Sequence, residues 1–334
     1  MAEQRRVRRK KVRMLDIARK SGVSIAAVSS VLRGSTNISV AGETRARILE
    51  NITKLGYVYP NSGAKSRQNF SLLVISRYPF NNLMVTDILH GIERALVPLK
   101  GRMLLSMVEE AIPTLVSAGS SFFEGLAGVL FISRIHAECA QTLRSRGIPY
   151  AVVGSGGYYP ETDMVYSNPL GYGLQGLEYL HSLGHERIGL IVGPLPHYSY
   201  QTLIMAFKNH MLEKFGRVDP HLIGIIDSEN SGEDVLGKML ACAHRPTAIM
   251  GVNLNLYGVA GPLGLKIPKQ LSFLTLDTPG TVSGISFIGA DNANLGQEGV
   301  QAILRRHERP DAPIRHITLP VRIVENGSCR NISN

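Results

Sequence analysis

From Leu72 onward, short apolar runs alternate with segments of helical periodicity, and this alternation restricts the fold more than any other feature of the sequence. Many of the runs are apolar at every position, which is typical of parallel strands buried on both faces. The alternation continues for roughly 260 residues and predicts a doubly wound α/β fold arranged as two lobes. The runs expected to form strands are "LLVIS" (72–76), "RMLLSMV" (102–108), "AGVLFIS" (127–133), "IPYAVVG" (148–154), "RIGLIVG" (187–193), "LIGIID" (222–227), "TAIMGV" (247–252), "LSFLTLD" (271–277) and "ISFIGA" (285–290).

The chain before this region reads as short helices instead. In "RMLDIARKS", Met14, Ile17 and Ala18 share one helical face. Gly22 ends that helix, and "SIAAVSSVL" follows it with Ser24 as the N-cap. Two short helices joined by a tight glycine-containing turn are the helix-turn-helix pattern.

A third helix is predicted for "ETRARILENITKLGY", with a C-cap signal at Gly56. The segment "YPNSGAKSRQN" (59–69) then has the composition of a linker. The residues expected to face inward are Val28, Val31 and Leu32 on the second helix and Ile48, Leu49, Ile52 and Leu55 on the third.

Positive charge is concentrated at the beginning of the chain. Residues 1–67 hold 15 lysines and arginines against 4 acidic residues, a net charge of +11, whereas the rest of the chain carries −1 of the total of +10. This asymmetry indicates a polyanion-binding segment attached to a neutral domain. For "RRVRRKKVR" alone, a solvated tail is an equally good interpretation.

Several function classes find no support in the sequence. It contains no GxGxxG after the first strand, no P-loop, no HExxH and no GxSxG, and "GSGG" (154–157) precedes "YYPE" and reads as a loop. Three widely spaced cysteines favour neither a disulfide framework nor a zinc site. We therefore expect no enzyme activity, no cofactor and no metal. Because no run approaches the length of a membrane span and no apolar segment follows the basic N-terminus, we expect a cytoplasmic protein.

The stretch "GVSIAAVSS" (22–30) carries small side chains where a surface helix would normally present long polar ones. A recognition helix enters a major groove about 12 Å wide, so short side chains at its start allow close approach. Ser24 and Ser29 can then hydrogen-bond phosphate oxygens, while Ile25 and Ala26 contact thymine methyl groups. The alternative is a small buried helix in a structural bundle, and the charge together with the linker favours DNA binding.

The stretches "MLDIARKSGVSIAAVSSVLRGS" and "ISVAGETRARILENITKLGYVYPN" resemble the headpiece of the LacI-type (lactose/galactose repressor) family of transcription regulators. "YLHSLGHERIGLIVGP", "RPTAIMGVN" and "KIPKQLSFLTLDT" resemble the sugar-binding core of that family in order and spacing, so the resemblance covers nearly the whole chain. It implies a helix-turn-helix, a hinge that reaches the minor groove and a two-lobed core similar to periplasmic sugar-binding proteins. It also implies a homodimer on double-stranded, pseudo-palindromic operator DNA, with an effector between the lobes.

The DNA-contacting positions implied by the resemblance fall into three groups. Positions at or near the phosphate backbone hold Ser24, Ala27, Ser29 and Arg33, with Arg13 and Met14 at the start of the headpiece. Base-reading positions hold Ile25, Ala26 and Ser30. Tyr57 and Asn61 lie on the approach to the hinge, and Ala64 and Arg67 lie in it.

The sequence departs from the family in the DNA-contacting part. Members usually carry Arg at the position of Ser30, where it can make a bidentate contact to guanine that Ser cannot make. We therefore expect a changed operator at that base pair, or reliance on other contacts, with Arg33 one helical turn further on as a partial substitute. The hinge stretch "AKSR" has Arg67 where the family has a leucine that wedges into the minor groove, so insertion is expected to be weaker or different.

The expected effector site departs further. Gly154 replaces an aspartate, Gln201 replaces the arginine that clamps sugar hydroxyls, and Ala290 replaces a glutamine. Asn253 and Asp277 keep the family's residue types. Gln201, Asn253 and Asp277 are therefore the expected effector-binding residues, each equally well read as a structural polar residue. We expect a small polar effector (a sugar, sugar acid or nucleoside) of unusual kind, or none at all.

These observations predict a sequence-specific transcription regulator, most simply a homodimeric repressor of carbohydrate-related genes with effector control through the inter-lobe cleft. The alternative is a ligand-binding protein of the same core fold with reduced or lost DNA binding. The expected domains are a headpiece with a basic arm (1–58), a hinge (59–69), a first lobe (70–158 and 292–309) and a second lobe (159–291 and 310–330).

Overall fold

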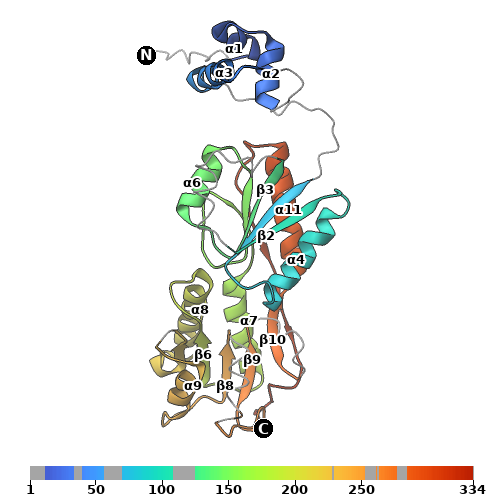
Figure 1. Ribbon diagram of the computed structural model, residues 1–334. Helices are drawn as coiled ribbons and strands as arrows, with labels where there is room; N and C mark the ends of the chain where they lie inside the picture. Colours follow the sequence, from blue (N-terminus) through green and yellow to red (C-terminus); the bar gives the residue numbers. More distant parts are fainter. Residues whose placement is uncertain are drawn as a thin grey trace, which may run out of the picture. The chain divides into compact units, whose positions relative to one another are not determined.

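The chain divides into two compact units, Met1–Gln68 and Asn69–Asn334 (Figure 1). The computed structural model describes residues 12–33, 40–55, 70–107, 125–227, 229–252, 261, 263–276 and 284–333.

The first unit contains three helices, α1 (Met14–Ser21), α2 (Ile25–Arg33) and α3 (Gly42–Leu55). Gly22 adopts φ +65°, a left-handed conformation that favours glycine, and this ends α1. The Ser24 hydroxyl then accepts a hydrogen bond from the backbone N–H of Ala27 at 3.1 Å. The predicted turn and N-cap are therefore confirmed, because short-range backbone chemistry fixes both.

A small apolar core joins these helices. Its buried members are Ile17, Ala18, Val28, Val31 and Ile48, with Met14, Val23, Val40, Ile52 and Leu55 packed against them. The side-chain amide of Asn51 also donates to the Ser21 hydroxyl at 3.0 Å, which ties α3 to α1 inside the unit. The prediction for Leu49 was wrong, since it is 47% exposed. One residue beyond Ile48, it is rotated about 100° away from the inward stripe. The side chain of Leu32 and the C-cap at Gly56 lie outside the described residues.

The second unit contains two six-stranded sheets, as the alternation of apolar runs predicted. The first sheet has the order β11-β5-β4-β3-β1-β2, and all of its paired strands are parallel. The first sheet consists of β1 (Ser71–Ser76), β2 (Arg102–Ser106), β3 (Leu126–Ile132), β4 (Tyr150–Val153), β5 (Asp163–Ser167) and β11 (His316–Leu319).

The second sheet has the order β12-β10-β9-β8-β6-β7 and is parallel except at one edge, where β12 runs antiparallel to β10. It consists of β6 (Ile188–Val192), β7 (Ile223–Ile225), β8 (Ala248–Gly251), β9 (Ser272–Thr275), β10 (Ser286–Ala290) and β12 (Val321–Val324). A strand at the edge can reverse direction without disturbing the pairing of the strands inside, as in many doubly wound sheets.

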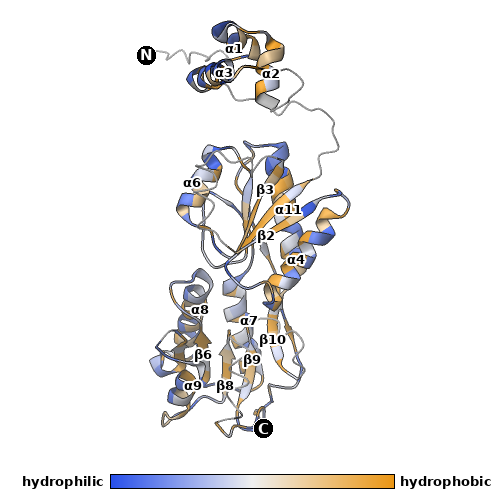
Figure 2. Ribbon diagram, in the orientation of Figure 1, coloured by the Kyte–Doolittle hydropathy of each residue, from blue (hydrophilic) through white to orange (hydrophobic). Residues whose placement is uncertain are grey.

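Helices cover both sheets, so that each lobe has its own hydrophobic core. The strands are mainly hydrophobic, and the helices carry both kinds of residue (Figure 2). In the first lobe the described helices are α4 (Leu83–Leu96), α6 (Ala137–Ser145) and α11 (Asn292–Glu308). In the second they are α7 (Pro169–Ser182), α8 (Tyr198–Phe215) and α9 (Gly232–Leu240), with a short 3₁₀ turn at Pro220–Leu222. No helix among the described residues is long and apolar enough to cross a membrane.

The predicted lobe boundaries need a correction. We expected 159–291 and 310–330 in the second lobe, but β5 and β11 pair with each other and belong to the first sheet. The chain passes between the lobes at Asn168, Asp291 and Pro320, directly after β5, β10 and β11. The sequence "DMVYS" did not read as a strand because it begins with a charged residue.

That residue, Asp163, is buried and paired with cations from distant parts of the chain. Its carboxylate accepts hydrogen bonds from Arg305 at 2.6 Å and from Arg306 at 2.7 and 3.0 Å, and also from the backbone N–H of Arg315 at 2.8 Å. A buried charge is tolerated when it is paired and fully hydrogen-bonded. The contact therefore anchors the end of α11 and the start of β11 to β5.

The backbones of α4 and α11 approach each other closely at two glycines. A Cβ atom on Gly91 would overlap the carbonyl oxygen of Ala293, and one on Gly296 would overlap the carbonyl oxygen of Ile88. These atoms are backbone and cannot rotate away, so only glycine permits this approach. Helix α11 packs against β3, β4 and β5, and α4 packs against α11 and contacts β2.

We predict that Gly91→Ala lowers the free energy of unfolding by about 1–3 kcal/mol, because the added methyl forces α4 and α11 apart. The matched control is Gly237→Ala on α9, where an added Cβ meets nothing within 4 Å. There the removal of glycine flexibility should raise stability by about 0.5–1 kcal/mol. Denaturant unfolding of both variants checks the prediction, and equal effects would contradict it.

Candidate functional site

The first candidate surface is the start of α2. Ser24 and Ala26 are exposed, Ile25 is 46% exposed and Ala27 is half-buried. All four side chains are short or compact, so a partner surface can approach the helix backbone there. The N-terminal end of a helix also presents unpaired backbone N–H groups and a partial positive charge, both of which attract phosphate.

Ser29 and Ser30 lie deeper than the sequence suggested. Their exposed fractions are 9% and 6%, and both residues make further interactions. Their roles toward phosphate and base edges remain predictions. The side chain of Arg33 lies outside the described residues, as do Tyr57, Asn61, Ala64 and Arg67.

Several basic side chains of the same unit are exposed to solvent. Arg13 is exposed, and its backbone N–H donates to the Asp16 carboxylate at 2.7 Å, whereas Met14 is half-buried against the small core. Further exposed cations that sequence reasoning did not single out are Arg19, Lys20, Arg45 and Arg47. The excess positive charge of this unit is therefore carried in part by side chains that face solvent, as a polyanion-binding surface requires.

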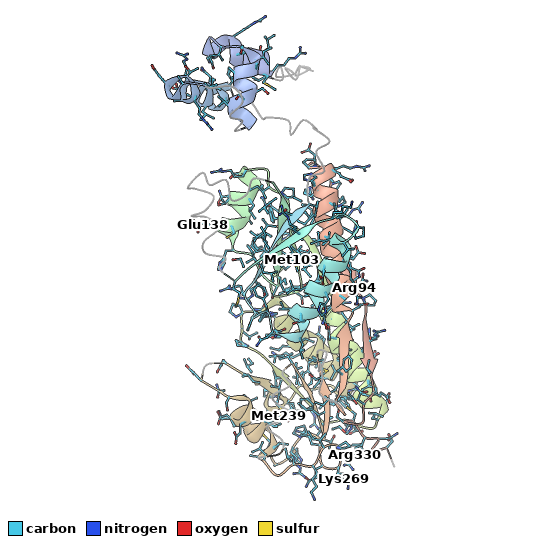
Figure 3. All side chains as sticks on the ribbon, turned by 45° about the vertical axis from the view of Figure 1, so that its right-hand side comes forward. Arg94, Met103, Glu138, Met239, Lys269 and Arg330 are labelled. Atoms are coloured by element: carbon cyan, nitrogen blue, oxygen red, sulfur yellow. The ribbon has the colours of Figure 1, made fainter. Side chains whose placement is uncertain are left out.

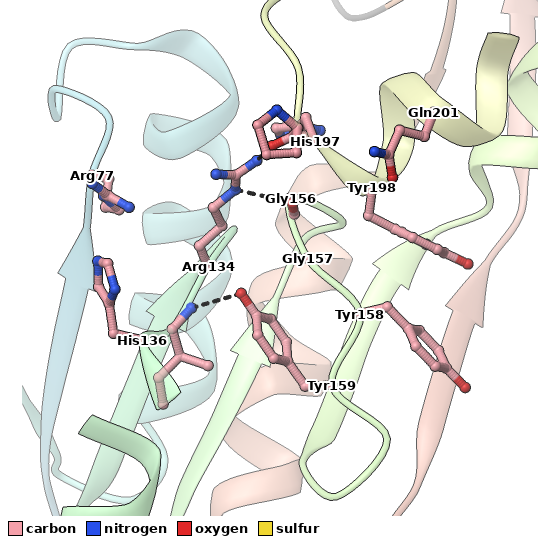
Figure 4. Close-up of a pocket in the computed structure, with 12 residues that line it drawn as sticks. Arg77, Arg134, His136, Gly156, Gly157, Tyr158, Tyr159, His197, Tyr198 and Gln201 are labelled. Carbon is pink, nitrogen blue, oxygen red and sulfur yellow. Dashed lines mark hydrogen bonds between the residues drawn. The ribbon is translucent and has the colours of Figure 1, made fainter. Parts of the chain in front are cut away.

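The second candidate site is a cleft of about 410 Å³ between the two lobes (Figure 4). Its walls are the loops that follow β1, β3 and β4 in the first lobe and the start of α8 in the second. In open α/β sheets the crevice beyond the carboxyl ends of the strands is the usual ligand site. The lining residues are Arg77, Arg134, Ile135, His136, Gly156, Gly157, Tyr158, Tyr159, Pro196, His197, Tyr198 and Gln201.

Arg134 bridges the two lobes at the centre of the cleft. Its Nε donates to the carbonyl oxygen of Gly156 at 3.0 Å, and one terminal nitrogen donates to the carbonyl oxygen of Pro196. The neighbouring backbone N–H of Ile135 donates to the hydroxyl of Tyr159 at 3.1 Å. These bonds hold the loop after β3 against the loop after β4.

The loop 154–157 also contacts the start of α8. The backbone N–H groups of Tyr198 and Ser199 donate to the carbonyl oxygens of Gly156 and Ser155 at 3.2 and 3.1 Å. The hydroxyls of Ser155 and Ser199 are 2.6 Å apart. The prediction that "GSGG" is a loop is confirmed, and it satisfies N–H groups that a helix start leaves unpaired.

His197, the N-cap residue of α8, lies beside Arg134 in the cleft. Its Nε2 is 3.4 Å from the hydroxyl of Tyr78, and its ring stacks on Tyr200 with centroids 4.1 Å apart. Burial, with a smaller contribution from the charge of Arg134, lowers the pKa of His197 to about 4. The imidazole is therefore neutral near pH 7. Tyr158 stacks on Tyr198 across the lobes with centroids 5.4 Å apart.

Of the predicted effector-binding residues, Gln201 lines the cleft, whereas Asn253 and Asp277 lie outside the described residues. Sequence reasoning missed the two arginines, the two histidines and the three tyrosines of the lining. A signal was available, since Arg77 follows β1 directly and Arg134 lies two residues after β3. The lining residues offer groups for binding, and no carboxylate among them accompanies the histidines to form an acid–base pair.

Both units of the chain are similar to known protein families. Residues 13–61 match the family described as "Bacterial regulatory proteins, lacI family", and residues 177–329 match the "Periplasmic binding protein-like domain" family. The chain is 25% identical over 349 residues to the HTH-type transcriptional regulator MalR of Streptomyces coelicolor, covering 95% of this chain and 96% of MalR. It is 25% identical over 329 residues to the ribose operon repressor of Haemophilus influenzae, with 92% and 95% covered.

Among solved structures, the lac repressor dimer bound to operator and the anti-inducer ONPF has the same fold. The TM-score is 0.64 at 21% identity, with 96% of this chain and all of that chain covered. The helix-turn-helix unit and the two-lobed core thus occur together in relatives along nearly their whole length. Regulators of this kind bind DNA and are not enzymes. A lacI-family helix-turn-helix segment and a periplasmic-binding-protein-like domain thus occur in one chain, and this is the make-up of a DNA-binding transcriptional regulator of the LacI type.

Proposed function

We propose that the protein represses carbohydrate-related genes by binding a pseudo-palindromic operator as a homodimer, under the control of a small polar effector in the inter-lobe cleft. The observation that carries this proposal is the presence in one chain of an exposed recognition-helix start and a cleft lined from both lobes. The ribose operon repressor of H. influenzae is, by its name, also a repressor. A regulator that acts on chromosomal DNA works in the cytoplasm.

In this proposal α2 enters the major groove with its N-terminal end. Ile25 and Ala26 are the exposed residues suited to thymine methyl groups, and Ser24 can reach a phosphate. Hydrogen bonds to phosphates set the register of the helix, while the apolar contacts select bases. Ser30 remains the proposed position at which this operator differs from those of better-known relatives.

Dimerisation is supported by apolar side chains exposed in the first lobe. Strand β2 is the edge of its sheet and exposes Leu104 and Leu105, each at 45%. Val97 follows α4 and is 69% exposed, and Leu83 at the start of α4 is 41% exposed. Exposed apolar side chains on an edge strand and a neighbouring helix favour association with a second copy. A two-fold dimer matches a palindromic site, and the lac repressor structure is likewise that of a dimer bound to operator.

Effector control is supported by the contacts between the lobes. The hydrogen bonds from α8 to the loop 154–157 connect the two lobes across the cleft. A ligand bound between the lobes therefore contacts both of them and favours the lobe arrangement that fits it better. A ligand shifts an equilibrium only through its different affinity for the two states. The cleft walls supply that difference because they come from both lobes.

We predict steeply salt-dependent binding to the intergenic DNA upstream of the protein's own gene. A protein with six to ten phosphate contacts loses about 10³–10⁵ in affinity between 50 and 200 mM salt. Deleting residues 1–11, which contain six Lys and Arg, should reduce the slope of log K against log salt by about 0.9 for each phosphate that the arm neutralises. Fluorescence anisotropy measures both slopes. An unchanged slope would mean that the arm is a solvated tail, and no binding at low salt would favour the ligand-binding alternative.

We also predict that Ser30→Arg changes the preferred base pair toward guanine at one position of each half-site. Arginine can make a bidentate contact to guanine worth about 1–3 kcal/mol of discrimination, which serine cannot make. Selection of bound sequences from random DNA compares the variant with the parent. Because Ser30 is 6% exposed, thermal unfolding must first establish that the variant folds. An identical preference in a folded variant would place this residue away from the base edges.

A third prediction concerns the dimer. Replacing Leu104 and Leu105 by Asp should weaken self-association at least about tenfold, because charges at an apolar contact lose solvation without a partner. The control is Leu212→Asp on α8, which is 56% exposed in the second lobe and should leave the dimer intact. Sedimentation equilibrium measures both constants. Equal behaviour of the two variants would contradict this interface.

A further inference from the structure

The described lining of the cleft has an uneven distribution of charge. It includes Arg77, Arg134, His136 and His197, and none of its twelve residues is Asp or Glu. In Figure 4 these two arginines and two histidines lie on one side of the 156–157 turn, while Tyr158, Tyr198 and Gln201 lie on the other. The cleft thus has a cationic side, charged through Arg77 and Arg134, and an aromatic, polar side.

The two arginines retain hydrogen-bonding capacity. Arg77 is exposed and makes no hydrogen bond or ion pair to the residues that the structure describes. Arg134 donates to two carbonyl oxygens, which orient the guanidinium without neutralising its charge. Arginine presents a planar set of N–H donors that matches the oxygens of a carboxylate or phosphate.

His197 adds a neutral polar group beside them. Its Nδ1 is buried and has no hydrogen-bond partner among the described residues. A buried polar atom without a partner carries a desolvation cost that a ligand group can relieve. The helix α8 begins at the next residue and directs the positive end of its dipole toward the same region.

A neutral sugar matches this arrangement less well than an anion does. Its hydroxyl oxygens can accept hydrogen bonds from the guanidinium groups, but they supply no opposite charge, so the contact is weaker than a charge-assisted one. An anionic ligand supplies that charge and makes charge-assisted hydrogen bonds. The volume of about 410 Å³ lies in the range of small-molecule sites.

We propose that the effector is a small anionic carbohydrate, a sugar phosphate or a sugar acid. Its charged group lies against Arg77 and Arg134, and its ring lies beside Tyr158 and Tyr198. This proposal rests on the proposed function, since it names the ligand class of the same cleft. The proposed effector differs from a neutral monosaccharide in its negative charge, which complements the positive charge of the cleft lining.

The test is isothermal titration of the full chain with matched sets of ligands. Each set contains a neutral sugar (glucose, fructose or ribose), its phosphate monoester and its sugar acid. At least one charged compound should bind about tenfold or more tightly than its neutral parent, as expected for a charge-assisted contact. Comparison of the phosphate monoester with the sugar acid shows whether the site prefers a phosphate or a carboxylate group. Equal or tighter binding of the neutral parents, or no saturable binding of any charged compound, would overturn the proposal.

Variants of the cationic side test the contact itself. Arg77→Gln should weaken the charged ligand about tenfold or more and leave the neutral parent unchanged. Arg134→Gln should also weaken the charged ligand. Arg77→Gln gives the clearer result, because Arg134 also donates to backbone carbonyls of both lobes and its loss can change the lobe arrangement. The matched control is Arg94→Gln on α4, an exposed arginine outside the cleft (Figure 3), which should have no effect. Retained affinity in Arg77→Gln and Arg134→Gln alike would overturn the proposal.

Operator binding in the same preparation separates this proposal from the proposed function. Anisotropy of labelled operator DNA is measured with and without the tightest charged compound. If operator binds and no charged compound binds, only the ligand class fails. If a charged compound binds and no DNA binds, the regulatory function fails while the ligand class stands.

Discussion

The polarity of the parallel strands determines where chemistry can occur in the core. In each sheet the paired strands other than β12 run in one direction, so their carboxyl ends meet at a single edge. The loops after β1, β3 and β4 leave that edge in the first lobe, and the start of α8 follows β6 in the second. The cleft lined by these segments is therefore a consequence of strand direction, and the residues on these loops and at the start of α8 set its ligand class.

The two units use different means to attract negative charge. The headpiece combines a helix start with short side chains and a net charge of +11 over residues 1–67, which suits a long polyanion. The cleft holds two arginines within a nearly neutral core and suits a single anionic group. In the proposed complex the effector binds Arg134, and Arg134 also donates to carbonyl groups of both lobes. Ligand binding and lobe arrangement then involve the same side chain, which is a direct route for coupling.

Short-range signals made much of the fold predictable. The nine apolar runs all contain strands, and Gly22 and Ser24 form the expected turn and cap, because these features depend on neighbours in sequence. The prediction that Leu49 faces inward was wrong, because helical periodicity alone does not fix the width of the buried face of a helix. Strand β5 was missed because Asp163 reads as polar. Its burial depends on Arg305, Arg306 and the backbone N–H of Arg315, all more than a hundred residues away in the chain.

The sequence by itself determined the resemblance to LacI-type regulators, the two kinds of unit and the unusual residues at the expected contact positions, since motifs and periodicity are local properties of the chain. The tertiary structure decided the assignment of β5 and β11 to the first lobe, the burial of Ser29 and Ser30, and the gathering of Arg77, Arg134 and His197 in one cleft. Arg77 and His197 are 120 positions apart in the chain, and nothing in their local sequence marks them as neighbours. Their proximity follows from the crossover connections that align strand ends, and such long-range geometry exists only once both sheets have formed.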